Sequence, residues 1–216
     1  IFLYHFIGAI FFFKLLQNRF KSEIIAIVGL LFFILTPRLF GDSFQNNKDI
    51  IFLSLYSISL FYFFKTLDFK KNYNIILFGL FSALATSIRI VGFFLPASFL
   101  FIWVLNNFSQ NKNLNIKSIF LYFFSFFTFL IIFWPLLWEN PIENFLSYFD
   151  VLGDYFNSKV LFLGNYYFSN NLPYYYLFFW IYVSTPLIHL IFFSCGFVFY
   201  SIRLVKRFFN IKKVSL

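Results

Sequence analysis

The chain has 216 residues, of which 61% are hydrophobic, 28% aromatic and 12% charged, and its formal net charge is +9. A water-soluble core of this length does not need so much apolar surface, so the composition predicts an all-α, multi-pass transmembrane helix bundle. Apolar runs such as "IFLYFFSFFTFLIIF" do not alternate with polar residues, which excludes a transmembrane β-barrel.

Seven apolar segments approach the roughly 20 residues that a membrane span needs. The candidate spans cover residues 1–16, 24–37, 50–65, 74–88, 90–106, 118–138 and 175–202. We expect them to form a single transmembrane domain over residues 1–216, with a large outer loop at about 139–174 and a basic cytoplasmic tail at 203–216. Ile1 opens directly in an apolar run without a start methionine or a targeting segment, so we expect an internal fragment of a longer protein.

The loops between these spans fall into two sets of different charge. One set carries a net charge of +11 and the other −2, which together give the +9 of the chain. The positive-inside rule places the first set in the cytoplasm and the second set, with the segments around Asp49 and Arg89, on the outer side. Topology therefore explains the basic net charge, and we expect no nucleic-acid partner.

The first outer loop, "TPRLFGDSFQNNKDIIF" at residues 36–52, places several charges between apolar runs. Only 14 residues separate Glu23 from Arg38, and they rise about 21 Å as a helix, less than the hydrocarbon thickness of about 30 Å. A run of the same length precedes Arg89. Both arginines are thus expected near membrane depth, where an ionisable group indicates a functional site. Snorkelling of a long side chain to the headgroups is the alternative.

The charged residues of this outer side suit a phosphate ligand. Arg38 and Arg89 offer planar forks of donors and Lys48 a compact charge, so these three are the candidate donor-phosphate ligands. Asp49 either caps the third span, a role for which Asn47 competes, or holds a divalent cation or orients an acceptor hydroxyl. Asp42 is a second candidate for positioning an acceptor or metal, although "FGDSF" also fits a turn. No cofactor other than such a divalent metal ion is expected.

The large outer loop contains "ENPIENFLSYFDVLGDYF", which has the pattern of a helix start. Asn140 fits an N-cap, Pro141 the first helical position and Glu143 a capping box. The apolar positions that follow at helical spacing are Ile142, Phe145, Leu146, Phe149 and Leu152. We expect an amphipathic helix in the outer interface, as a cover over a lipid-substrate cavity or as a plain surface helix. The tyrosine-rich segment after it fits an interfacial aromatic belt.

Four segments of the chain occur in an order that resembles a known family. They are "TPRLFGDSFQNNKDIIFLSLY", "GLFSALATSIRIVGFFLP", "WPLLWENPIENF" and "VLFLGNYYFSNNLPYYYLFFWIYVSTP". This order is similar to that of bacterial membrane glycosyltransferases of the GT-C superfamily, in the branch akin to protein O-mannosyltransferases and the aminoarabinose transferase of lipid A. The resemblance covers roughly residues 5–190.

The resemblance implies an inner-membrane enzyme that moves a sugar from a polyprenyl-phosphate carrier to a lipid, glycan or protein acceptor on the periplasmic side. Asp49 matches the family's active-site acid at the head of a span, and Arg89 matches the basic residue that closes a Gly- and Ala-containing pattern. Arg38, Lys48 and Arg89 would stabilise the phosphate leaving group. The family's best-known acid follows its first transmembrane helix. We expect that acid upstream of Ile1 and expect the fragment without it to be inactive.

A non-catalytic membrane protein is the rival interpretation, either a flippase or transporter for a lipid-linked saccharide or a scaffold in a complex. A flippase needs polar residues that continue toward the cytoplasmic half of the spans. The spans offer only small, scattered ones, namely Ser54, Ser57, Ser82, Thr86 and Ser87. The sequence therefore favours the enzyme, and an assay that separates sugar transfer from lipid translocation distinguishes the two.

Overall fold

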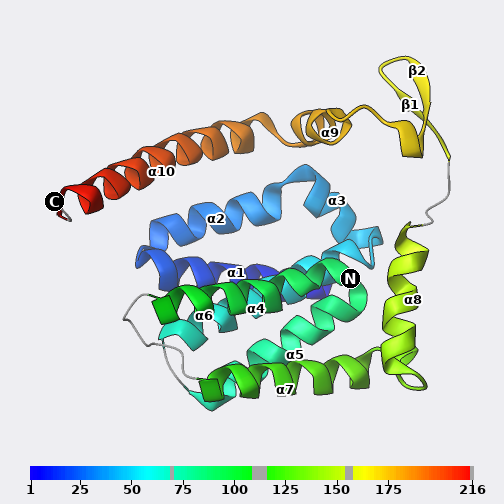
Figure 1. Ribbon diagram of the computed structural model, residues 1–216. Coiled ribbons are helices and arrows are strands. Elements are labelled where there is room, and N and C mark those ends of the chain that lie inside the picture. Colours follow the sequence, from blue (N-terminus) through cyan, green and yellow to red (C-terminus); the bar gives the residue numbers. More distant parts are fainter. Residues whose placement is uncertain (69–70, 109–115, 154–157, 215–216) are drawn as a thin grey trace. The chain divides into compact units, whose positions relative to one another are not determined.

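The computed structural model describes residues 1–68, 71–108, 116–153 and 158–214 (Figure 1). The chain forms two compact units, Ile1–Leu152 and Gly153–Leu216. Helices dominate both units, and in the described ranges the strands are confined to one short hairpin. This confirms the predicted all-α class.

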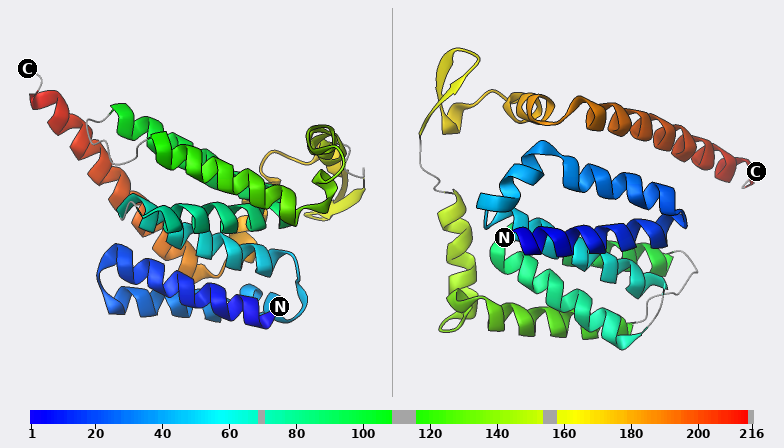
Figure 2. Two further views of the ribbon diagram at one scale, coloured as in Figure 1. Left: turned by 90° about the horizontal axis from the view of Figure 1, so that it is seen from below. Right: turned by 180° about the vertical axis from the view of Figure 1, so that it is seen from behind.

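The first unit is a bundle of consecutive helices joined by short connections. Its elements are α1 (Phe2–Phe20), α2 (Glu23–Leu35), α3 (Pro37–Gln45), α4 (Asp49–Asp68), α5 (Asn72–Ile88), η1 (Ile90–Phe93), α6 (Phe94–Phe108), α7 (Ile116–Phe133), η2 (Pro135–Leu137) and α8 (Pro141–Gly153). Helix α1 packs against α2 and α4, α4 packs against α5, and α5 packs against α7. Figure 2 shows these long helices side by side, so that helix ends meet at two ends of the bundle.

Two glycines let the central helices approach closely. A Cβ atom on Gly8 of α1 would lie 2.8 Å from the Cα atom of Ser54 on α4, and one on Gly79 of α5 would lie 2.1 Å from Ser125 Oγ on α7. Small residues at such crossings are typical of membrane helices, because lipid tails supply no hydrophobic force between helices and close backbone packing takes its place.

Aromatic rings and hydroxyl groups fill the space between α4, α5, α6 and α7. The ring of Phe78 stacks on Tyr122 with centroids 4.4 Å apart, and Phe99 packs edge-on to Phe78 at 5.4 Å. The hydroxyl oxygens of Ser59 on α4 and Ser82 on α5 lie 2.9 Å apart, within hydrogen-bond distance. These contacts fix α5 relative to α4, α6 and α7. Helix α4 begins at the charged residue Asp49, and Arg89 follows the last residue of α5.

Three described helices are long and apolar enough to cross a membrane: Asp49–Leu67, Ile116–Phe133 and Leu187–Lys206. The pair α2–α3, bent by 57°, counts as a fourth if it is one broken span. Two shorter apolar helices, Asn72–Ile88 and Ile90–Leu105, match two further predicted spans. These apolar helices support an integral membrane protein, while the number of seven spans stays a prediction.

The segment predicted as the first outer loop is largely helical, which corrects the sequence interpretation. Helix α2 ends at Leu35, because a residue before proline is disfavoured in the helical region, and Thr36 has an extended backbone with φ −62° and ψ 117°. Pro37 then starts α3 at the first helical position, where its missing N–H costs nothing. Residues 37–45 are therefore a helix, and a short connection leads from it to α4.

Two other prolines also set helix boundaries. Pro96 lies in the first turn of α6 after η1, where proline is tolerated. The predicted span at 175–202 is split into α9 (Tyr176–Ser184) and α10 (Leu187–Val214), because Pro186 follows an extended Thr185. The long apolar helix thus begins at Leu187.

Helix α8 begins at Pro141, as predicted from its capping pattern. Its side toward the bundle is formed by Phe145 and Tyr148, whose rings pack at 6.3 Å and 5.4 Å from Trp134. Ile142 and Leu146, expected on the same apolar face, are exposed. The side chains of Phe149 and Leu152 lie outside the described part. The helix is thus confirmed, and its position in the outer interface stays a prediction.

The second unit contains the hairpin of β1 (Lys159–Phe162) and β2 (Asn165–Phe168), followed by η3 (Ser169–Asn171), α9 and α10. Phe162 pairs with Asn165 across a two-residue turn in which Leu163 and Gly164 have φ of 50° and 83°. Positive φ at both positions matches the twist of a tight hairpin. Phe162 is buried against the rings of Tyr176 and Phe179, at 4.9 Å and 5.2 Å. The sequence interpretation missed this hairpin.

Candidate functional site

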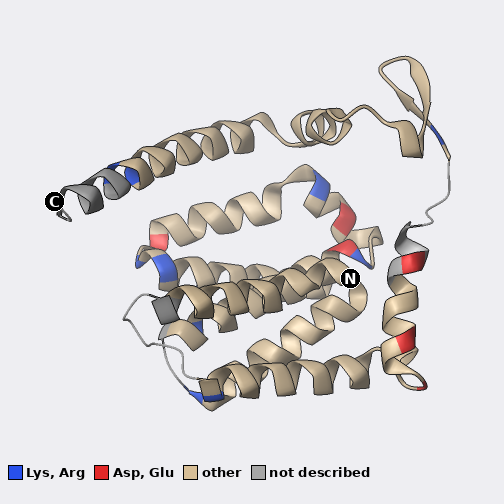
Figure 3. Cartoon of the chain, in the orientation of Figure 1, with Lys and Arg blue, Asp and Glu red and all other residues tan. Residues whose placement is uncertain are grey.

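Charged residues of the first unit gather at the ends of its helices, and the ribbon between them carries few (Figure 3). The end that contains α3, the start of α4 and the end of α5 holds both signs of charge. Its members are Arg38, Asp42, Lys48, Asp49 and Arg89, the residues predicted to form the site.

An ion pair joins the start of α4 to the end of α5. The Nη2 atom of Arg89 contacts the Oδ1 atom of Asp49, although 39 residues separate the two in the sequence. Both side chains remain accessible, with 44% of Arg89 and 47% of Asp49 exposed. The pair thus has one side held by the bundle and another side open to a ligand.

Asn46 holds Asp49 from the other direction. Its Nδ2 donates to Asp49 Oδ2 at 2.8 Å, while its Oδ1 accepts from the backbone N–H of Asp49 at 3.0 Å and of Lys48 at 3.3 Å. The Asn46 side chain thus satisfies two backbone N–H groups at the start of α4 and binds the Asp49 carboxylate, whereas its own backbone N–H donates to Asp42 of α3 at 2.8 Å. The sequence interpretation proposed Asn47 for this role, and the structure corrects it to Asn46.

The backbone around Arg89 is fixed by the turn between α5 and η1. The N–H of Arg89 donates to Ala85 at 3.0 Å, and the Arg89 carbonyl accepts from Gly92 at 2.8 Å. A Cβ atom on Gly92 would lie 2.6 Å from the backbone nitrogen of Thr86. Only glycine therefore allows the chain at position 92 to lie so close to Thr86. The resulting turn leads the chain back over the end of α5 and directs the Arg89 side chain toward Asp49 on α4.

Arg38 lies in a different local arrangement. Its Nε is 3.9 Å from Asp42 Oδ2, one turn along α3, and 70% of the Arg38 side chain is exposed. Among the described side chains, no ion pair links Arg38 or Asp42 to the Asp49–Arg89 pair. Lys48 is exposed beside Asp49. The structure thus brings Asp49 and Arg89 together directly, and it leaves Arg38 and Lys48 as accessible cations on the neighbouring segments.

This geometry suits the binding of a phosphate group whose negative charge increases during a reaction. Asp49 holds one guanidinium nitrogen of Arg89, and the fork of a guanidinium offers further donors to a phosphate oxygen. The carboxylate of Asp49 has its two oxygens engaged by Arg89 and Asn46. It retains capacity for a further hydrogen bond, since an ionised carboxylate has about four lone-pair sites.

The described residues do not assemble a metal-ligand set. No group of three His, Cys, Asp or Glu side chains in the described part could hold a metal ion together. Of the two residues predicted to position a metal, Asp49 already binds Arg89 and Asn46, and Asp42 lies 3.9 Å from Arg38. A divalent cation at Asp49 would meet the positive charge of the Arg89 guanidinium, so this arrangement disfavours a metal there.

Sequence reasoning missed two residues that position the pair. Asn46 had a detectable signal, because Asn followed by Asp three residues later and then by an apolar run resembles a capping box. Gly92 had no comparable signal, since its role depends on the approach of η1 to Thr86. Both act on the orientation of Asp49 and Arg89.

A comparison with protein families gives one match. The model of the family described as dolichyl-phosphate-mannose-protein mannosyltransferase matches residues 1–138, which include every predicted site residue. No curated protein and no solved structure matches the chain. The match covers more than half of the 216 residues and confirms the resemblance inferred from the sequence. The chain therefore belongs to the dolichyl-phosphate-mannose-protein mannosyltransferase family, a family of membrane glycosyltransferases.

Proposed function

We propose that the protein transfers a sugar from a polyprenyl-phosphate carrier to an acceptor on the outer, periplasmic side of a bacterial inner membrane. The observation that carries this proposal is the Asp49–Arg89 ion pair at an end of the bundle that also exposes Arg38 and Lys48. Three cations and two carboxylates gathered at one end suit a phosphate group and a hydroxyl acceptor better than a neutral solute.

The proposed roles follow from where charge develops. When the glycosidic bond to the carrier breaks, the phosphate oxygen takes the bonding electrons and gains negative charge. Arg89, with Arg38 and Lys48, stabilises that charge, and donors fixed before the reaction do this most effectively. Asp49 orients Arg89 and accepts a hydrogen bond from the acceptor hydroxyl. The carrier tail lies among the apolar helix surfaces that face lipid.

The assignment of the Asp49–Arg89 pair to the outer side of the membrane rests on the charge of the helix ends. The helix ends opposite the pair carry mainly lysine and arginine, as the positive-inside rule expects of a cytoplasmic face. The end with Asp49 and Arg89 is balanced in sign, which fits the outer face.

Transfer in vesicles of defined orientation tests the proposal. The full-length protein is reconstituted with a radiolabelled polyprenyl-phosphate sugar and a mixture of membrane acceptors, and label in product is measured beside label moved across the bilayer. We expect transfer only when the Asp49 face has access to donor, and a loss of about 100-fold or more in Asp49→Asn, the scale of removing one preorganised electrostatic group. Glu139→Gln, which removes an exposed carboxylate outside the site, is the matched control.

Label that crosses the bilayer without entering product would overturn the proposal in favour of a flippase. Equal transfer by wild type and Asp49→Asn would remove Asp49 from the site while leaving the family assignment in place.

A further inference from the structure

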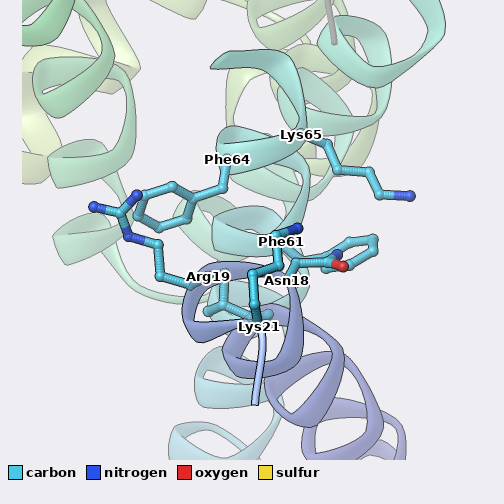
Figure 4. A pocket seen from close by; sticks show the side chains of 7 residues that line it. Asn18, Arg19, Lys21, Phe61, Phe64 and Lys65 are labelled. Carbon is cyan, nitrogen blue, oxygen red and sulfur yellow. The ribbon is translucent and has the colours of Figure 1, made fainter. Parts of the chain in front are cut away.

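A pocket of about 470 Å³ lies at the other end of α4, between the last turns of α1 and α4 (Figure 4). Its apolar wall is formed by Leu15, Phe61 and Phe64, and its polar wall by Asn18, Arg19, Lys21 and Lys65. The volume lies within the range of small-molecule sites. From Asp49 to Lys65 the helix rises about 24 Å, so the pocket is separate from the Asp49–Arg89 pair.

The cations of this pocket have aromatic rings rather than carboxylates as neighbours. The guanidinium of Arg19 lies 5.5 Å from the centroid of Phe64, and the Lys65 ammonium lies 4.8 Å from that of Phe61. Among the described side chains, no acidic group forms an ion pair with Arg19, Lys21 or Lys65. Cation–π contacts favour the charge but do not neutralise it. Three cations thus line one pocket with room for an anion, and Arg19 and Lys65 extend to opposite sides of it (Figure 4).

Lys21 adds backbone evidence that its side chain matters at this place. It ends α1 in the left-handed conformation, with φ 53° and ψ 30°, and its N–H donates to Gln17 at 3.0 Å. Glycine is the residue that adopts this conformation without steric cost. A lysine here accepts strain and places an ammonium in the pocket wall.

We propose that this pocket binds the phosphate headgroup of an anionic membrane phospholipid. The net charge of the loops on this side predicts the cytoplasmic face, where anionic lipids attract basic residues and where basic pockets between spans hold their headgroups. An acyl chain finds apolar surface nearby, because Phe20 and Ile24 at the α1–α2 turn are 54% and 75% exposed. A lipid on α1 and α4 ties together the two helices that carry the pocket.

Lipid retention on the purified full-length protein tests the proposal. After delipidation in detergent, native mass spectrometry follows titration with phosphatidylglycerol, with zwitterionic phosphatidylcholine and with soluble glycerol 3-phosphate. We expect phosphatidylglycerol to bind at least tenfold more tightly than phosphatidylcholine, and glycerol 3-phosphate not to compete. Arg19→Gln and Lys65→Gln each weaken binding roughly fivefold, the factor that corresponds to one basic residue at a membrane surface.

Lys21→Gly separates charge from folding. The substitution removes the strain of a lysine in the left-handed backbone conformation, so the variant keeps or gains thermal stability. It loses lipid affinity because the ammonium is gone. Lys117→Gln removes a positive charge from the start of α7, outside the pocket, and keeps wild-type affinity.

Equal losses in Lys117→Gln and Lys65→Gln would overturn the proposal, since the effect would then come from general surface potential. Full competition by glycerol 3-phosphate would also overturn it and identify a soluble phosphate ligand. Neither result depends on sugar transfer, so this proposal fails or stands independently of the proposed function.

Discussion

The two ends of helix α4 carry charge in different ways. At its start Asp49 is paired with Arg89 from α5 and bonded to Asn46. Near its end Lys65 lies over the Phe61 ring, without an acidic partner among the described side chains. An ionised side chain near hydrocarbon is stabilised by an opposite charge or by reaching the headgroups. The paired end thus suits charge that appears during a reaction, whereas the unpaired end leaves its cations available to an anion from outside.

The largest effect is expected from a substitution that shifts the backbone of Arg89 and leaves its side chain unchanged. Gly92→Ala places a Cβ atom 2.6 Å from the backbone nitrogen of Thr86, so η1 must shift and Arg89 with it. We expect a loss of unfolding free energy of about 1–3 kcal/mol, as for overpacking at other tight sites, and at least a tenfold loss of transfer.

Thermal unfolding in detergent and the transfer assay measure the two effects. Gly41→Ala in α3 is the control, because no atom lies within 4 Å of its added Cβ. Lipid retention at the opposite end should remain unchanged in both variants. A stable, fully active Gly92→Ala protein would show that the turn does not position Arg89.

A smaller effect is expected from the cap of α4. Asn46→Ala removes the acceptor for two backbone N–H groups and the donor to Asp49 Oδ2, and it should cost about 1 kcal/mol of stability. Asn46→Ser keeps an N-cap acceptor but lacks the amide donor. We therefore expect Asn46→Ser to retain most of the stability and to show reduced transfer, measured by the same two assays. Equal stability and equal activity of all three proteins would exclude a positioning role for Asn46.

The smallest effect concerns the second ion pair at this end. Arg38 and Asp42 are separated by 3.9 Å on the exposed side of α3, and such i,i+4 pairs contribute about 0.3–0.5 kcal/mol. Asp42→Asn should change the unfolding free energy by less than about 0.5 kcal/mol, and the change should shrink as added salt screens the pair. A loss above about 1 kcal/mol, measured by denaturation in detergent, would mean that Asp42 has a partner beyond Arg38.

The sequence predicted the helical class, the start of α8 and the family from apolar runs, capping residues and ordered motifs. Charge pattern and span length also selected Asp49 and Arg89 independently, and the structure pairs them. The sequence could not predict α3, because a proline within a charged, glycine-containing segment fits both a loop and a helix start. The pocket around Arg19 and Lys65 depends on how α1 crosses α4, which no local pattern encodes. The sequence also did not predict the hairpin, because the contacts that bury Phe162 come from α9, which is distant from it in the sequence.

We propose that Asp49 and Arg89 act as one unit in sugar transfer. A double-mutant cycle in the full-length protein measures it most directly, with the transfer rates of wild type, Asp49→Asn, Arg89→Gln and the double variant. If the two residues form one site, each single variant loses about 100-fold or more and the double variant loses little beyond that, since effects of cooperating residues are not additive. Losses that multiply, or single variants as active as wild type, would contradict the claim.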